Sequence, residues 1–396
     1  MPNADRALSA STPGYSLGQL LSYMLRLGSL GFGGPVALAG YMHRDLVERR
    51  GWISEADYKE GLALAQLAPG PLAAQLAIYL GYVHYRIVGA TLVGLAFVLP
   101  SFLMVLALGW AYVRFGGLAW MQAVFYGVGA AVTGIIVMSA KKLTEKSVGK
   151  DRLLWALYLL IAVSTVLTES EVAWLMVACG VLVWLLRAPP RWLGGARLHG
   201  VAGTAALPLA ALAGAPGTAG LLAQIAVFFT KAGAFVFGSG LAIVPFLYGG
   251  VVTEHHWLTE HQFVDAVAVA MITPGPVVIT VGFIGYLVAG LPGACVAALA
   301  TFLPCYLFTV IPAPYFKRYG KLPGVIAFVD GITAAAVGAI AGSVVVIARR
   351  SLVDLPTAAM ALAVIVLLWR FKKLQEPVIV AGAAALGLLL YPLLHG

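Results

Sequence analysis

The sequence predicts an all-α polytopic membrane protein made of two homologous repeats. Of its 396 residues, 61% are hydrophobic and 10% are charged, whereas a soluble domain carries about 25% charged residues. Many apolar segments reach the roughly 20 residues that a helix needs to cross a hydrocarbon core. A motif at Phe32-Gly33 returns 205 residues later as Phe237-Gly238, which indicates internal duplication. We expect about 10 to 14 membrane helices or half-helices, because lipid leaves no other partner for backbone polar groups.

Charge and cysteine usage exclude several other classes of protein. The formal net charge is +9, but Lys and Arg cluster in short loops between apolar segments, as the positive-inside rule describes. We find no basic face interleaved with aromatic residues, so nucleic acid is not an expected partner. Cys179, Cys295 and Cys305 lie in apolar runs without metal-type spacing. The sequence therefore predicts no cofactor and no bound metal.

The first repeat is expected over residues 16–187, after an N-terminal polar tail at 1–15 that lacks the pattern of a signal peptide. Its first apolar segment runs from about Ser16 to Met42. This segment is broken near Gly31 to Pro35, because glycine has too much backbone freedom for a helix and proline lacks an N–H donor.

A helical hairpin is expected over residues 54–85. Ser54 resembles a helix N-cap, and the short helix that it opens ends at Pro69-Gly70-Pro71. The apolar piece Leu72 to Tyr85 follows, so two half-length helices would dip into the membrane, which requires surrounding protein. Conventional spans are expected at about 87–113, 118–140, 153–168 and 170–187.

A linker region at 188–218 separates the first repeat from the second, which covers residues 219–396. The basic loop 141–152 is expected in the cytoplasm. In the second repeat, basic residues fall one span earlier, at Lys317 and Arg318. This shift favours two inverted repeats, a common plan of secondary transporters, although Arg349 and Arg350 argue against it.

Two cations occupy matching positions inside apolar segments. Arg26 and Lys231 each lie six residues before a Phe-Gly pair. A charge inside the membrane costs at least about 2.5 kcal/mol, so both residues call for a counter-charge or a ligand. We expect them to bind a divalent anion together. The alternative is that each side chain reaches the interface or neutralises a protein carboxylate.

The helix breaks add backbone donors to this site. A resumed helix presents unsatisfied N–H groups and the positive end of its dipole, which together bind anions. Gln75 and Thr280 occupy matching places beyond the breaks and could hydrogen-bond an oxyanion. The alternatives are that the breaks only kink helices for packing and that the polar groups bond the backbone. The other predicted substrate-binding residues are Phe32, Gly33, Gly34, Pro35, Phe237, Gly238, Ser239, Gly240, Pro69, Gly70, Pro71, Pro274, Gly275 and Pro276.

Three carboxylates are candidates for proton coupling. Glu60 and Asp265 each lie nine residues before the first proline of a Pro-Gly-Pro motif, on a short apolar helix. The alternative for both is a first-turn acid favoured by the helix dipole. Asp330 lies inside an apolar segment where the first repeat has Tyr126, and it could instead pair with Lys231.

A histidine cluster suggests a different class of function. His255, His256 and His261 lie close together in the sequence, so a membrane-embedded metalloenzyme is the alternative. The first repeat has Arg50, Gly51 and Ala56 at these places, which favours an interfacial turn.

These motifs together resemble the chromate ion transporter (CHR) family in its long, two-domain form. The resemblance rests on GFGGP, RRGW-ISE and QLAPGP and on their second copies FGSG, HHW-LTE and ITPGP, and it extends over residues 16–395. The breaks around Arg26 and Lys231 match the family pattern. Ser239 and Gly240 stand where the first copy has Gly34 and Pro35, so the two breaks are not expected to have equal roles.

The resemblance implies a secondary transporter, not an enzyme, that exports chromate through the cytoplasmic membrane and confers chromate resistance. It also implies sulfate as an isosteric competitor and the proton gradient as energy source. A sulfate or other oxyanion permease is the alternative within the same class. The lipid bilayer is the expected environment of this multi-pass protein, and a homodimer is one arrangement that the sequence allows.

Overall fold

The computed structural model describes residues 14–31, 34–115, 119–168, 173–189, 218–235, 237–238, 243–319, 322–352, 354–371 and 376–395. The first repeat forms α1 (Leu17–Leu30), α2 (Gly34–Met42), a π-helical turn (His43–Arg49), α3 (Glu55–Leu67), β1 (Gly70–Pro71), α4 (Leu72–Phe115), α5 (Ala119–Ser147), α6 (Arg152–Thr168) and α7 (Ala173–Arg187). The second repeat forms α9 (Thr218–Phe235), β2 (Phe237–Gly238), α10 (Ile243–Tyr248), a π-helical turn (Gly249–Glu254), α11 (Glu260–Ile272), a 3-10 turn (Val277–Ile279), α12 (Thr280–Val310), α13 (Ala313–Tyr319), α14 (Pro323–Ser351), α15 (Leu355–Arg370) and α16 (Glu376–His395).

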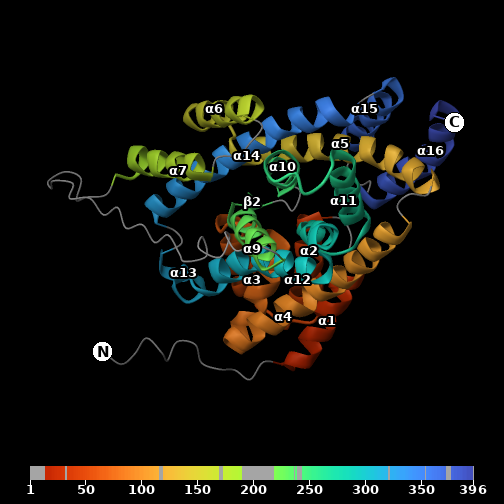
Figure 1. Cartoon of the computed structure of the whole chain (residues 1–396). Helices are drawn as coiled ribbons and strands as arrows, with labels where there is room; N and C mark the ends of the chain where they lie inside the picture. Colours follow the sequence, from red (N-terminus) through yellow and green to blue (C-terminus); the bar gives the residue numbers. More distant parts are fainter. Residues whose placement is uncertain are drawn as a thin grey trace, which may run out of the picture.

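The helices form two groups. Figure 1 shows a layer of α5, α6, α7, α14, α15 and α16 along one side of a body built from α1–α4 and α9–α12. Within the described part of the chain, three helices are long and apolar enough to cross a membrane: Leu72–Phe115, Val277–Phe316 and Pro323–Val346. The chain is an all-α, multi-pass membrane protein, as the composition predicted.

The helices α1 and α2 form an antiparallel hairpin. The Tyr23 hydroxyl on α1 donates to the carbonyl of Tyr41 on α2 at 3.1 Å. Tyr15, just before α1, stacks on Trp52 with 5.0 Å between ring centroids. Residues equally far from the break therefore lie side by side. The break predicted near Gly31 to Pro35 within the segment from Ser16 to Met42 is confirmed, and the chain turns back on itself there.

A second hairpin joins α3 to the first part of α4, and it confirms the hairpin predicted over residues 54–85. Ser54 caps α3 by accepting a hydrogen bond from the Asp57 N–H at 3.1 Å. The two helices then pack without space between them, since a Cβ at Gly61 would lie 2.3 Å from the Tyr79 ring.

The long helix α4 is two antiparallel helices, 72–85 and 87–115. Arg86 separates them with non-helical backbone angles of φ 52° and ψ −141°. Across this turn the backbones touch, because a Cβ at Gly81 would lie 2.4 Å from the Gly89 carbonyl oxygen.

The second repeat has the same path. Phe228 on α9 stacks on Phe246 on α10 with 5.5 Å between ring centroids, so these helices are also antiparallel. The helix α12 turns back at Gly290, with φ 61° and ψ −152°, where Gly285 approaches Gly293. We number the hairpins 1 (α1–α2), 2 (α3 and residues 72–85), 3 (α9–α10) and 4 (α11 and residues 277–288).

The hairpins of the two repeats open toward opposite sides. Residues 87–115 begin at the open end of hairpin 2. Midway, Phe97 packs on Gly28 near the tip of hairpin 1, and further on Gly109 packs on Tyr286 near the open end of hairpin 4. We call the side where hairpins 1 and 2 open the first face, and the opposite side the second face.

The two repeats exchange their last helices. The helices α6 and α7 of the first repeat pack on α14 of the second, whereas α15 and α16 pack on α5 of the first. Small residues allow this contact, since a Cβ at Gly338 would lie 2.4 Å from the Tyr158 carbonyl oxygen and one at Gly127 would lie 2.0 Å from that of Ala383. The layer in Figure 1 is therefore shared between the repeats.

Candidate functional site

The tips of the hairpins meet inside the body, and each repeat pairs with the other. The strand β1 at the tip of hairpin 2 runs parallel to β2 at the tip of hairpin 3, with Gly70 opposite Phe237. On the other side, the Gly275 N–H of hairpin 4 donates to the Gly31 carbonyl of hairpin 1 at 2.9 Å. The Pro-Gly-Pro segment of each repeat thus bonds to the helix break of the other. We call this meeting point the central crossing.

Both central glycines of the Pro-Gly-Pro motifs are required by geometry. Gly70 has φ +143° and Gly275 has φ +97°, values that side chains rarely allow. A Cβ at Gly275 would lie 2.0 Å from the Ser101 hydroxyl oxygen, and one at Gly70 would lie 2.7 Å from the Gln75 amide. The same Ser101 hydroxyl donates to the carbonyl of Pro274 at 2.7 Å, so it fastens α4 to hairpin 4.

A small cavity of about 10 Å³ lies at the crossing, lined among others by Pro35, Pro71 and Pro276. It lies beside the first turns of α2 and α4, whose N–H groups have no partner within their own helix. A volume of this size holds about one water molecule. The crossing is therefore closed to a tetrahedral oxyanion in this conformation.

Gln75 and Thr280 are both completely buried next to the crossing. Gln75 Nε2 donates to the Pro69 carbonyl at 2.9 Å, while its Oε1 atom has no hydrogen-bond partner within the described residues. An unsatisfied buried acceptor costs about 1–3 kcal/mol. The Thr280 hydroxyl instead donates to the Val277 carbonyl at 2.6 Å, so the two matching positions differ.

Four predicted site residues, Phe32, Gly33, Ser239 and Gly240, lie outside the described residues. Gly34 begins α2. The remaining predicted residues of the breaks, Pro35, Pro69, Gly70, Pro71, Phe237, Gly238, Pro274, Gly275 and Pro276, all belong to the hairpin tips.

Arg26 lies away from the closed crossing, in an open cavity of about 470 Å³ beside hairpin 1. We call this cavity the first vestibule. Its polar lining consists of Tyr23, Arg26, Tyr41, Arg44, Asp45, Arg49 and Arg50, and Gly31 also lines it.

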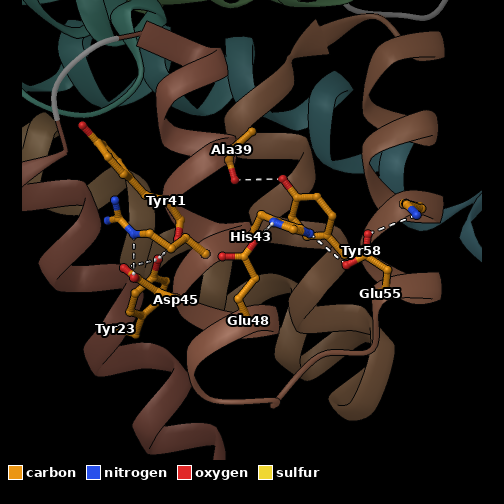
Figure 2. Close-up of polar contacts among 10 residues, drawn as sticks. Tyr23, Ala39, Tyr41, His43, Asp45, Glu48, Glu55 and Tyr58 are labelled. Carbon is orange, nitrogen blue, oxygen red and sulfur yellow. Dashed lines mark hydrogen bonds and ion pairs between the residues drawn. The ribbon is translucent and has the colours of Figure 1, made fainter.

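The wall of the first vestibule is cross-linked by hydrogen bonds. Asp45 accepts from Arg44 at 3.3 Å and from Arg49 at 3.2 Å, and the Tyr23 hydroxyl donates to it at 3.4 Å. Figure 2 shows Asp45 beside Tyr23 and, on the other side of the turn, His43 between two glutamates. These contacts connect hairpin 1 with the turn that follows it.

Lys231, the counterpart of Arg26, is exposed on α9 of the second repeat. All residues that line the first vestibule belong to the first repeat, so Arg26 and Lys231 do not share this cavity. In the turns that follow hairpins 1 and 3, the repeats use different side chains at matching positions. Arg50 lies over Trp52 at 4.4 Å, whereas His255 stacks on Trp257 at the same distance between rings.

The carboxylates Glu60 and Asp265 both contact tyrosines. The Tyr112 hydroxyl of α4 donates to Asp265 at 2.8 Å, which links the repeats. Asp265 is only 8% exposed. Glu60 is half-buried and hydrogen-bonds Tyr79 within its own hairpin. The two carboxylates are thus equivalent in sequence but differ in burial and in partner.

Asp330 belongs to the shared layer and not to the crossing. It pairs with Arg187 at 3.3 Å, and not with Lys231, which was one of the two possibilities for this residue. Arg187 also contacts Asp151. Hydrogen bonding by the Leu154 N–H, together with Arg187, holds the pKa of Asp151 below its usual value.

The histidine cluster has no metal-site geometry. Among the described residues, no group of three or more His, Cys, Asp or Glu side chains could hold a metal ion. His255 is stacked on Trp257, and His256 Nδ1 lies 2.9 Å from the Val252 carbonyl oxygen.

Sequence reasoning missed Ser101, Tyr112 and the arginines after hairpin 1. Ser101 and Tyr112 lie in a span that reads as plain apolar helix, and only contacts across the repeat interface give them a role. The arginines carried a signal, because Arg44, Arg49 and Arg50 crowd one turn, but basic residues between apolar segments are also what the positive-inside rule describes.

Comparison with known proteins agrees with this architecture. A family model described as Chromate transporter matches twice, at residues 18–184 and 223–388. The chain is 74% identical to a chromate transport protein of Cupriavidus metallidurans, over 100% of this chain and 98% of that protein. It is 64% identical to a probable chromate transport protein of Synechococcus elongatus (99% and 100%) and 31% identical to a chromate transport protein of Pseudomonas aeruginosa (98% and 96%). No solved structure matches it significantly. With both repeats matched and full-length relatives at this identity, the chain belongs to the chromate transporter family.

Proposed function

We propose that this protein is a secondary transporter that exports chromate across the cytoplasmic inner membrane, uses the proton gradient and so confers chromate resistance. The observation that carries the proposal is the reciprocal pairing at the central crossing, where broken helices of two repeats meet in the protein interior. Transporters place their substrate at such repeat interfaces, and helix N-termini bind its anionic groups. The names of the relatives favour chromate as the anion.

The binding site forms when the hairpin tips separate. The first turns of α2 and α4 then offer N–H groups to the oxyanion, and Gln75 and Thr280 are the nearest buried side chains. Arg26 approaches from hairpin 1 and Lys231 from hairpin 3. An unsatisfied buried oxygen such as Oε1 of Gln75 supports a polar occupant here.

The repeats are inverted in the membrane. Their hairpins open at opposite ends of residues 87–115, as the packing of Gly28 and Gly109 indicates. The basic turn after hairpin 1 and the basic loop 141–152 then share the first face. By the positive-inside rule this face is cytoplasmic, so the first vestibule opens toward the compartment from which chromate is exported.

The exchanged helices decide which parts move. Because α6, α7, α15 and α16 each pack on the other repeat, the shared layer holds the two repeats together in this proposal. Alternating access instead separates the hairpin tips at the crossing, as hairpins move relative to one another and to the shared layer. Asp265, and with it Glu60, carries the coupling proton in this scheme, because both are on the moving hairpins. Asp330 has no such role, since its ion pair with Arg187 belongs to the layer.

Flux in inside-out vesicles tests the proposal. We expect uptake of radiolabelled chromate that requires an imposed proton gradient and collapses with an uncoupler. Sulfate should compete, because it is a tetrahedral dianion of similar shape. Uptake of sulfate without uptake of chromate would favour the alternative of a sulfate permease. Gradient-independent flux of both would contradict proton coupling.

A further inference from the structure

The first vestibule carries an excess of positive charge. Four guanidinium groups, of Arg26, Arg44, Arg49 and Arg50, line it together with one carboxylate, Asp45, which leaves a formal charge of +3. In a cavity with walls of low dielectric constant, charge of one sign focuses the field and raises the local concentration of the opposite ion. An excess of this size attracts a dianion from solution.

The four arginines differ in whether their guanidinium groups have partners in the protein. Asp45 holds Arg44 and Arg49, and Arg50 lies over the rings of Tyr23 and Trp52 at 5.4 and 4.4 Å. Arg26, by contrast, has no ion pair or hydrogen bond with any residue that the structure describes. Three guanidinium groups therefore have partners in the protein, and the fourth is available to a ligand.

The position of the cavity relates it to the crossing. At about 470 Å³ it accommodates a tetrahedral anion with some of its water, which the crossing cavity of about 10 Å³ does not. Gly31 lines the vestibule, and the carbonyl of the same residue accepts the hydrogen bond from Gly275 at the crossing. An anion held by Arg26 would thus lie beside the hairpin tips, which must separate before the central site can form.

The second repeat lacks the basic lining of the first vestibule. At the positions that match Arg44 and Asp45 it has Gly249 and Gly250, and at those that match Arg49 and Arg50 it has Glu254 and His255. With Lys231 in place of Arg26, the formal charge on the equivalent surface is zero for a neutral histidine. The two repeats therefore share the hairpins, but only the first has the basic lining.

We propose that the first vestibule is an oxyanion-loading site, separate from the central crossing, and that the charge difference between the two faces makes loading one-sided. Its ligand is a tetrahedral divalent oxyanion, because guanidinium groups match such oxygens in pairs. Release on the second face meets no comparable attraction. This inference rests on the proposed transport of an oxyanion and adds a second site to it.

The test compares two double variants of the full-length protein in inside-out vesicles. R44Q/R49Q removes two vestibule charges, and K142Q/K150Q removes two exposed charges of the basic loop 141–152, outside the vestibule. For R44Q/R49Q we expect the KM for radiolabelled chromate to rise about tenfold with the maximal rate within twofold of wild type. The control pair should leave both values unchanged.

Ionic strength provides a measurement that needs no variant. For the wild type, the KM should rise steeply with added salt of an anion that is not transported, and this slope should flatten in R44Q/R49Q. Equal salt slopes in both proteins, or equal KM values in the two double variants, would overturn the loading site.

A third variant tests the one-sidedness. In G249R/E254R, the second face gains the missing charges, and we expect chromate uptake from that face to increase in right-side-out vesicles. No increase, with normal transport from the first face, would contradict the charge-difference argument. A wild-type protein that transports no oxyanion would instead remove the proposed function itself.

Discussion

At the scale of single residues, matching sequence positions have diverged in what they contact. Asp265 is nearly enclosed and receives the Tyr112 hydroxyl from the other repeat, whereas Glu60 is bonded within its own hairpin. Burial disfavours the charged form of a carboxylate, so a change in its surroundings changes its affinity for a proton. The movement of the hairpins supplies such a change, which makes Asp265 the better coupling candidate of the two.

Replacement of Asp265 by Asn should uncouple transport from the proton gradient. The amide keeps the size of the side chain and a hydrogen-bond acceptor for Tyr112, but it cannot carry a proton. We expect chromate exchange between equal concentrations to persist in D265N, while gradient-driven accumulation falls to background. E260Q, on the exposed first turn of the same helix, is the matched control. Accumulation in D265N with the wild-type pH profile would exclude Asp265.

At the scale of elements, the hairpin turns are where the repeats show strain most clearly. Gly290 and Arg86 turn equivalent hairpins with nearly the same backbone angles. Such angles cost glycine little, but they cost a residue with a Cβ about 1–3 kcal/mol. The first repeat therefore carries a strained turn that the second avoids.

R86G should stabilise the protein by about 1 kcal/mol, because glycine relieves the strained angles. R86A is the control, since it removes the same side chain and its contact with the Tyr82 ring but keeps the Cβ. Thermal unfolding of the purified protein in detergent is the measurement. A melting temperature that rises equally in both variants would show that the arginine side chain, and not the backbone, carries the strain.

At the scale of the whole molecule, the two sequence repeats are not two structural units. The central long helix of the first repeat, α5, is covered by α15 and α16 of the second repeat. The central long helix of the second repeat, α14, is covered by α6 and α7 of the first. An isolated repeat would expose these apolar surfaces and also leave its hairpin tips unpaired. Folding of either half thus depends on the other.

A chain cut within the linker region 188–218 tests this dependence. We expect residues 1–187 and 219–396 to copurify as a stable complex when they are produced together. Produced alone, each half should aggregate in detergent or be degraded. Size-exclusion chromatography and thermal unfolding distinguish the cases. A monodisperse, cooperatively unfolding half would show that the exchange of helices is dispensable.

The sequence by itself determined the class, the duplication and the breaks. Composition fixes a helical membrane protein, since lipid offers backbone groups no other partner. The glycines and prolines at positions such as Gly70 and Gly275 mark the breaks because few other residues adopt those angles. The hairpin over residues 54–85 followed from lengths too short for a span.

Only the tertiary structure decided which breaks meet and which helices are exchanged. Hydrophobic patterns show that a helix is buried but not against what, so the return of α2, the Ser101 bridge and the Arg187–Asp330 pair were invisible in the sequence. Arg26 illustrates the limit. Its matching position suggested one site shared with Lys231, whereas the fold places it in a vestibule of the first repeat alone, because hairpins that open in opposite directions carry equivalent residues toward opposite faces.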